Sequence, residues 1–119
     1  MTVGEIDPVG LARRLGSPGA APVLLDVREA DERAAMAISD SIHIPLAQLD
    51  PVELAGRLGA REVVVYCRSG VRSAVAGGAL AAAGVSVSHL AGGILAWVAA
   101  GHPVQGVQAG REAPAIIAR

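Results

Sequence analysis

Two short apolar runs constrain the fold of this chain more than any other feature of its sequence. They are Val23-Leu24-Leu25 and Val63-Val64-Val65-Tyr66, and polar residues follow each of them directly. A continuous apolar run of this length is typical of a strand that is buried on both faces of a parallel sheet. Segments with helical patterns alternate with these runs. The sequence therefore predicts an α/β fold, with a central, mainly parallel sheet of about five short strands and helices on both faces.

Turn and cap residues set the bounds of the other expected elements. Asp7-Pro8 supplies a helix N-cap and a proline at the first helical position, and Gly16 ends the same helix. Pro51 divides the helical segment 46–58 into two pieces. We expect further strands at 41–45 and 85–90, the second of them less apolar and nearer an edge. Further helices are expected at 29–35, 74–83 and 94–100.

Length and charge narrow the class of protein. The 119 residues correspond to a single domain, 1–119, with its core at about 5–104 and a C-terminal tail at 105–119. The net charge of −1 argues against nucleic acid and an anionic membrane surface as partners. The two longest apolar stretches have about twelve residues, whereas a membrane span needs about twenty. The chain start shows no signal-peptide pattern and the one free cysteine fits a reducing compartment, so we expect a cytoplasmic protein.

The single cysteine stands where the second apolar run should become a loop. The residues that follow Cys67 are Arg68, Ser69, Gly70, Val71, Arg72 and Ser73. Two arginines, the start of the following helix and the N–H groups around Gly70 would all stabilise a thiolate. A cysteine in an apolar strand is more often an inert core residue. An inert residue does not require a polar, doubly basic loop, so we expect Cys67 to be a nucleophile.

The spacing from Cys67 to Arg72 separates two kinds of chemistry. Loops with Cys-x5-Arg spacing cradle a phosphate, whereas the spacing here is Cys-x4-Arg. The shorter loop makes a smaller cradle, which suits a sulfane sulfur better than a phosphoryl group. The chain has no second cysteine, so an intramolecular dithiol cycle is excluded.

Four segments carry a resemblance to a known family. They are Leu24-Leu25-Asp26-Val27-Arg28-Glu29, Ile42-His43-Ile44-Pro45-Leu46, Val65-Tyr66-Cys67-Arg68-Ser69-Gly70-Val71-Arg72-Ser73, and Leu90-Ala91-Gly92-Gly93-Ile94-Leu95-Ala96-Trp97 with Gly101-His102-Pro103-Val104. In this order they resemble the signatures of the rhodanese (thiosulfate sulfurtransferase) family. The resemblance covers about residues 5–104 and implies a rhodanese-like fold in a single-domain member.

The resemblance also implies a reaction. Cys67 would be the catalytic residue and would carry a persulfide, taking sulfur from a small anionic donor such as thiosulfate. The acceptor would be cyanide or a thiol, on a small molecule or a protein. The substrate-binding residues would be those of the loop, Arg68, Ser69, Gly70, Val71 and Arg72.

Supporting roles follow from the same resemblance. Asp26 and Arg28, from the Asp-Val-Arg signature, and Ser73 would hold the loop in place. No metal and no organic cofactor is expected. The sequence departs from the family at 36–40, Met-Ala-Ile-Ser-Asp, where a Gly-His-Ile-Pro-Gly type run is usual, and at Arg33, where an aromatic residue is common.

Other functions and residues stay open at this point. The alternatives are a non-catalytic rhodanese-like binding or sulfur-relay module and, less in keeping with the loop spacing, a phosphatase or arsenate reductase. We expect His43 to be structural, assign no role to His89 or His102, and expect Glu29, Asp31 and Glu32 to form a solvated helix face. The stretch 73–110 has no charged residue and could face a partner or a second copy. The oligomeric state is left open.

Overall fold

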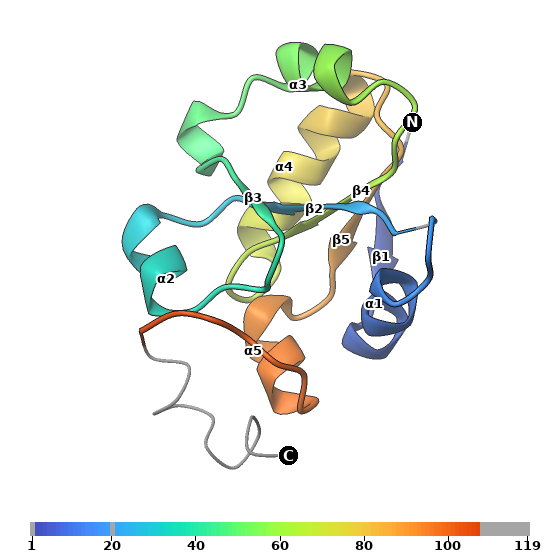
Figure 1. Ribbon diagram of the computed structural model, residues 1–119. Helices are drawn as coiled ribbons and strands as arrows, with labels where there is room; N and C mark the ends of the chain where they lie inside the picture. Colours follow the sequence, from blue (N-terminus) through green and yellow to red (C-terminus); the bar gives the residue numbers. More distant parts are fainter. Residues whose placement is uncertain (1, 20, 108–119) are drawn as a thin grey trace.

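The computed structural model describes residues 2–19 and 21–107 and has a five-stranded sheet at its centre (Figure 1). The strands, in chain order, are β1 (Gly4–Ile6), β2 (Val23–Asp26), β3 (Ile42–His43), β4 (Val63–Tyr66) and β5 (Val87–Leu90). They lie in the order β1-β5-β4-β2-β3, and every pair is parallel. The predicted α/β fold class is therefore confirmed, and β4, the strand directly before Cys67, is the central one.

Helices cover both faces of this sheet, as predicted. The helical segments are α1 (Pro8–Leu15), α2 (Ala30–Ala35), the 3-10 turn η1 (Leu46–Gln48), α3 (Pro51–Leu58), α4 (Val71–Ala82) and α5 (Gly93–Ala99). Helices α3 and α4 cover one face, and α1 and α5 cover the other (Figure 1). Alternate residues of β4 point to the two sides, so Val63, Val65 and Cys67 face α4 whereas Val64 and Tyr66 face α1 and α5.

The expected caps explain where several helices begin. The Asp7 carboxylate accepts a hydrogen bond from the Gly10 N–H at 2.7 Å, with Pro8 at the first helical position. Asp50 caps α3 in the same way through the Glu53 N–H at 3.1 Å. The break before Pro51 separates η1 from α3, as its sequence predicts.

Strand β5 lies inside the sheet, which corrects the expectation that it is near an edge. The edge beyond it is β1, a three-residue strand that the sequence pattern did not predict. Gly-Glu-Ile has no apolar run to signal a strand, and it is held by pairing with β5 over residues 4–6 and 88–90. The lack of a side chain at Gly4 lets the two strands pair without displacing the Ser88 side chain, since a Cβ there would lie 2.6 Å from Ser88 Oγ.

Helix α4 begins at Val71, three residues before the expected start. Its N-cap residue is Gly70, whose backbone has φ of 110°. That left-handed conformation favours glycine. The early start brings Arg72 and Ser73 into the first turn of the helix, next to Cys67.

The first residues of the expected C-terminal tail bond to the end of α2. Gln105 pairs with Ala37 in an antiparallel bridge, and the Val107 N–H donates to the Ala34 carbonyl at 3.0 Å. Residues 108–119 of that tail lie outside the described residues. Among the helices at 2–19 and 21–107, none is long and apolar enough to cross a membrane.

Candidate active site

Cys67 lies at the carboxyl end of β4 with its sulfur surrounded by hydrogen-bond donors. The Gly70 N–H donates to Sγ at 3.1 Å and the Ser73 N–H at 3.3 Å. The Ser73 hydroxyl oxygen lies 3.5 Å from the same sulfur. Because Gly70 provides no side-chain cap for α4, the sulfur of Cys67 takes the position of the cap acceptor at this helix. The cysteine is 1% exposed, so the loop encloses the sulfur closely.

This environment favours the thiolate. Burial opposes ionisation, but hydrogen bonds from the Ser73 hydroxyl and from the N–H groups of Ser73, Gly70 and Ser69 outweigh it, so the pKa of Cys67 lies below its ordinary value. The stabilisation comes mainly from these directed donors, and the arginines that the sequence suggested contribute less. A thiolate is the reactive form of cysteine, which makes Cys67 a candidate nucleophile.

The start of α5 fixes the cysteine loop from the other side. The Ile94 N–H donates to the Cys67 carbonyl at 2.9 Å, and the Leu95 N–H donates to the Arg68 carbonyl at 3.2 Å. Gly93 allows this approach, because a Cβ at that position would lie 2.3 Å from the Arg68 carbonyl oxygen. The Gly92-Gly93 turn is therefore the second support of the loop, beside α4.

Arg72 is engaged by an acidic residue that the sequence analysis placed in solvent. Its guanidinium donates to both carboxylate oxygens of Glu32, at 2.7 and 2.8 Å. The hydrogen bond from Arg72 lowers the pKa of Glu32 to about 2. The expectation that Glu32 belongs to a solvated face is thus wrong, because the fold brings Glu32 of α2 within reach of Arg72 of α4. Glu32 also accepts from the Glu29 N–H at 2.9 Å, which holds it in place at the start of α2.

The other loop side chains line the approach to the site. Arg68 is exposed, and within the described part of the chain its side chain makes no ion pair. Val71 is 73% exposed. A cavity of about 290 Å3 lies beside the loop, lined by Arg68 and Glu32 together with Arg28, Ala35, Met36, Ile94 and Leu95.

Asp26 and Arg28 form a buried ion pair that supports the wall of this cavity. Arg28 donates to both carboxylate oxygens of Asp26 at 2.9 Å, and to the carbonyls of Glu32 at 3.3 Å and Met36 at 2.7 Å. These contacts fix α2 and the segment after it. The Asp26–Arg28 pair therefore holds α2 and Glu32 in place. Among the described residues, it makes no hydrogen bond to the cysteine loop.

The atypical segment 33–43 is held by a polar network that uses its own unusual residues. Arg33 donates to Asp26 Oδ2 at 3.2 Å and to the Ser41 carbonyl at 2.7 Å. The Tyr66 hydroxyl donates to the same Asp26 oxygen at 3.2 Å and accepts from the Ile38 N–H at 3.1 Å. Arg33 therefore docks this segment onto the sheet through hydrogen bonds.

Of the three histidines, one is structural and one reaches the site. His43 Nε2 lies 2.8 Å from the Arg28 carbonyl oxygen, in agreement with a structural role. His89, to which no role was assigned, has Nδ1 at 3.2 Å from Ser73 Oγ. Sequence reasoning missed this residue because only the register of β5 against β4 reveals it. His89 pairs with Val65, two residues before Cys67 on the same face.

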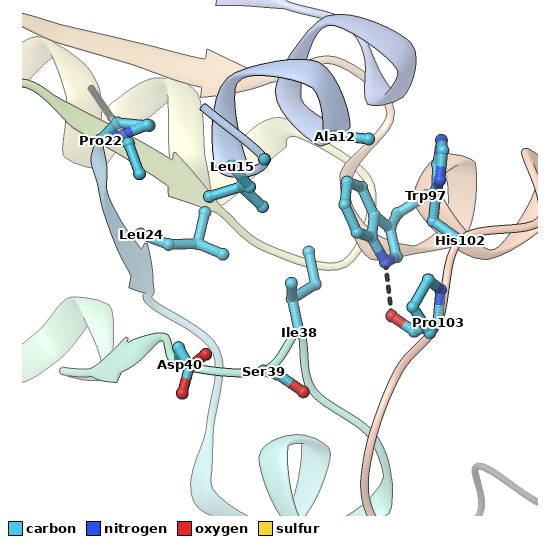
Figure 2. A pocket seen from close by; sticks show the side chains of 12 residues that line it. Ala12, Leu15, Pro22, Leu24, Ile38, Ser39, Asp40, Trp97, His102 and Pro103 are labelled. Carbon is cyan, nitrogen blue, oxygen red and sulfur yellow. Dashed lines mark hydrogen bonds between the residues drawn. The ribbon is translucent and has the colours of Figure 1, made fainter. Parts of the chain in front are cut away.

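A second cavity lies on the opposite side of the sheet and is largely apolar. It has a volume of about 460 Å3 and lies between α1, α5 and residues 38–40 (Figure 2). Figure 2 shows Trp97 at its wall, with the indole Nε1 donating to the Pro103 carbonyl at 2.9 Å. The residues around this cavity offer no cysteine, so the candidate site is the Cys67 loop. Across residues 2–19 and 21–107, no group of His, Cys, Asp and Glu side chains could hold a metal ion.

The chain is similar to known proteins in its sequence. The sequence matches the family model of the rhodanese-like domain over residues 7–100. It is 38% identical over 103 residues to a sulfurtransferase of Allochromatium vinosum, a match that covers 86% of this chain and 94% of the relative.

Solved structures show the same fold. A rhodanese-related protein from Thermoplasma volcanium superposes with a TM-score of 0.75 at 32% identity, covering 86% of this chain and 97% of that one. A thiosulfate sulfurtransferase from Pseudomonas aeruginosa has a TM-score of 0.74 at 32% identity, over 89% of this chain and 20% of its own. With the matching domain, the sequence relative and the common fold together, this chain belongs to the rhodanese-like domain family.

Proposed function

We propose that this protein is a sulfurtransferase that carries a sulfane sulfur on Cys67 as a persulfide. The observation that supports this most directly is the set of donors around Sγ, the N–H groups of Gly70 and Ser73 at 3.1 and 3.3 Å. Such donors stabilise a negative sulfur before the reaction and between its two halves. The sulfurtransferase relative from Allochromatium vinosum supports the same class of reaction.

The reaction would take place in two displacements. The Cys67 thiolate attacks the outer sulfur of thiosulfate, a new S–S bond forms, and the S–S bond of the donor breaks so that its electron pair leaves with sulfite. The persulfide anion remains on Cys67. A thiolate or cyanide then attacks the outer sulfur, takes it as a persulfide or as thiocyanate, and the Cys67 thiolate is regenerated. This is covalent catalysis with ping-pong kinetics.

Arg68 is the cation best suited to attract an anionic donor. It is exposed beside the cavity at the loop, whereas Arg72 is already paired with both oxygens of Glu32. Electrostatic attraction at an exposed position acts mainly on the rate and strength of encounter. Thiosulfate is a suitable candidate donor, since the structural relative from Pseudomonas aeruginosa is a thiosulfate sulfurtransferase over a longer chain.

The first experiment is intact-protein mass spectrometry after incubation with thiosulfate and removal of the excess. We expect the wild type to gain the mass of one sulfur atom and to lose it again, as thiocyanate, when cyanide is added. Cys67→Ala should gain nothing, because the nucleophile is absent. Ser17→Ala, on the exposed loop after α1, is the control and should behave as the wild type. A wild type that gains no sulfur from any sulfane donor would contradict the proposal.

A sulfur-relay module is the second candidate, and two observations favour it. Cys67 is 1% exposed, and Glu32 already neutralises Arg72, so a small dianion meets a partly closed site. In that case a protein persulfide would load Cys67 whereas thiosulfate would not. Assaying both donors with the same mass measurement separates the two functions. Hydrolysis of an aryl phosphate by the wild type and not by Cys67→Ala would instead indicate a phosphatase.

A further inference from the structure

We infer that His89 is a positioning residue for the Cys67 nucleophile, which it reaches through the hydroxyl of Ser73. The inference deepens the proposed sulfur transfer and rests on it, because it concerns how the same thiol is ionised. A chain of close contacts carries it. Cys67 Sγ lies 3.5 Å from Ser73 Oγ, and Ser73 Oγ lies 3.2 Å from His89 Nδ1.

The Cys67 end of this series of contacts is shielded from water. Ser73 is 0% exposed and Cys67 1% exposed, and the His89 side chain is 16% exposed. The outer part reaches solvent, since His89 Nε2 lies 3.4 Å from a carboxylate oxygen of Glu5, whose side chain is 67% exposed. The side chains of Ser73, His89 and Glu5 therefore connect the enclosed thiol of Cys67 to the surface.

The hydroxyl of Ser73 has the hydrogen-bonding capacity for a relay. The hydroxyl provides one donor and two acceptor sites. Its neighbours are Cys67 Sγ, His89 Nδ1 and the Gly70 carbonyl oxygen at 3.2 Å. With a neutral thiol, the S–H group donates to Ser73, and Ser73 donates to an unprotonated Nδ1. With a thiolate, Ser73 donates to the sulfur and accepts from a protonated Nδ1. In both arrangements the single hydroxyl proton goes to Nδ1 or to the sulfur, and the Gly70 carbonyl accepts from the Ala74 N–H at 3.2 Å instead.

Passing between these arrangements shifts two protons by one bond each, so that one proton is transferred in net from Cys67 to His89 and the total charge is unchanged. The S–H bond of Cys67 breaks as its proton goes to Ser73 Oγ. The original hydroxyl proton of Ser73 goes to His89 Nδ1. The products are a thiolate and an imidazolium, whose Nε2–H faces Glu5. No oxidant or other reactant takes part, and the proton returns by the same route when the thiol forms again.

A carboxylate faces the imidazole ring. Glu5, its register partner on β1, is the carboxylate that faces the ring. On the other side β4 presents the apolar Val65, and α4 presents Ser73. The titratable groups in reach of the ring, among the residues described, are thus Glu5 directly and Cys67 through Ser73. Both carry negative charge when the imidazole is positive.

The test measures the alkylation rate of Cys67 by iodoacetamide as a function of pH, which reports the thiolate and needs no sulfur transfer. We expect His89→Asn, which keeps a hydrogen-bonding group but cannot titrate, to move the midpoint upward by about one pH unit. At neutral pH its alkylation should be several-fold slower. Ser73→Ala should shift the midpoint in the same direction, and the double variant should shift no further, because the two side chains act in series.

Glu5→Gln provides a graded comparison. It should shift the midpoint in the same direction by less, since Glu5 acts from an exposed position. Glu53→Gln is the matched control, because its side chain is 66% exposed, close to the 67% of Glu5, and it lies on α3. A His89→Asn profile equal to that of the wild type would overturn the inference.

A second measurement uses the wild-type chain and avoids variants that fold poorly. The imidazole nitrogens of His89, His43 and His102 are observed by NMR at neutral pH, before and after Cys67 is blocked with a small alkylating agent. Since coupling between two sites is reciprocal, the Nδ1 resonance of His89 should change by more than those of the other two histidines once the thiolate is removed. Equal changes at the three histidines would overturn the inference. Persulfide formation measured by mass is independent of both results, so failure of the relay and failure of the sulfurtransferase proposal are distinguishable.

Discussion

The charge of Arg72 is shared between the candidate site and Glu32, and this bears directly on substrate binding. The guanidinium makes two hydrogen bonds to the Glu32 carboxylate, at 2.7 and 2.8 Å. An anionic donor that approaches the loop therefore meets one paired arginine and one exposed arginine, Arg68. Glu32 is in a position to weaken donor binding, and its removal tests that role.

Replacing Glu32 with glutamine should lower the KM for thiosulfate by roughly two- to fivefold, the range expected for one partly exposed charge. The neutral amide keeps the shape of the side chain but leaves the positive charge of Arg72 for the donor. Steady-state rates at several thiosulfate concentrations give the comparison. Glu53→Gln, which removes the partner of Arg57 on α3, is the control and should leave KM unchanged. A rise in KM for Glu32→Gln would mean that Glu32 holds Arg72 in the orientation that binds the donor.

Residue types in the sequence identify part of this site and leave the rest to the fold. The nucleophile and the loop donors lie within Cys67 to Ser73, so a local pattern was enough to find them. Glu32 and His89 come from α2 and β5, and nothing in their immediate sequence marks them. They reach the loop because parallel strands bring the ends of distant segments to one edge of the sheet.

At the scale of elements, the loop depends on two helix starts that approach each other closely. Gly70 begins α4 with a φ of 110°, and Gly93 in α5 has a φ of 62°. A side chain at Gly93 would meet backbone atoms, the Arg68 carbonyl oxygen at 2.3 Å and the Cys67 carbonyl oxygen at 2.6 Å. Backbone atoms cannot turn aside as the end of a flexible side chain can.

Gly93→Ala should therefore lower the free energy of unfolding by about 1–3 kcal/mol and slow the formation of the persulfide. Both effects follow from the displacement of the Cys67–Arg68 backbone. Urea unfolding followed by Trp97 fluorescence and the mass assay with thiosulfate measure them. Gly78→Ala in α4 is the matched control. A Cβ there meets nothing within 4 Å, and alanine in a helix should stabilise the protein by about 0.5–1 kcal/mol. Unchanged persulfide formation in Gly93→Ala would show that the loop adapts.

Elements with strong local signals were predictable, and those held by distant partners were not. Local residues alone signal three of these elements: apolar runs signal β2 and β4, and the Asp7-Pro8 cap signals the start of α1. Strand β1 is short and carries a charge, so its existence depends on β5. The start of α4 was expected at residue 74 because no Ser, Thr, Asp or Asn caps it at Gly70. The sulfur of Cys67 serves as acceptor instead.

On the scale of the whole molecule, the Glu32–Arg72 pair connects α2 to α4, and its contribution to stability depends on pH. Hydrogen bonding to Arg72 lowers the pKa of Glu32 from 4.5 to about 2 in the folded state. A carboxyl with a depressed pKa stabilises the fold fully above its unfolded value. That stabilisation is lost as the pH falls through the folded value. The relevant window is thus between 4.5 and about 2.

Glu32→Gln should be less stable than the wild type by about 0.5–1 kcal/mol at neutral pH, allowing for the solvent exposure of the pair. The difference should shrink as the pH falls below 4.5 and approach zero near 2, where the wild-type carboxyl takes up its proton. Urea unfolding at a series of pH values measures it. Glu53→Gln is again the control, since both side chains of that pair are more than half exposed. A difference that does not change with pH would contradict the assignment of the effect to this carboxyl.

The pairing of β1 with β5 joins the first and the last of the strands that the structure describes. A ribosome releases β1 long before β5, so a growing chain carries its first strand without a partner until almost the whole domain has been made. The face that presents Glu5 to His89 can form only at that late stage. Completion of the sheet and assembly of the histidine contact are therefore the same event in biosynthesis.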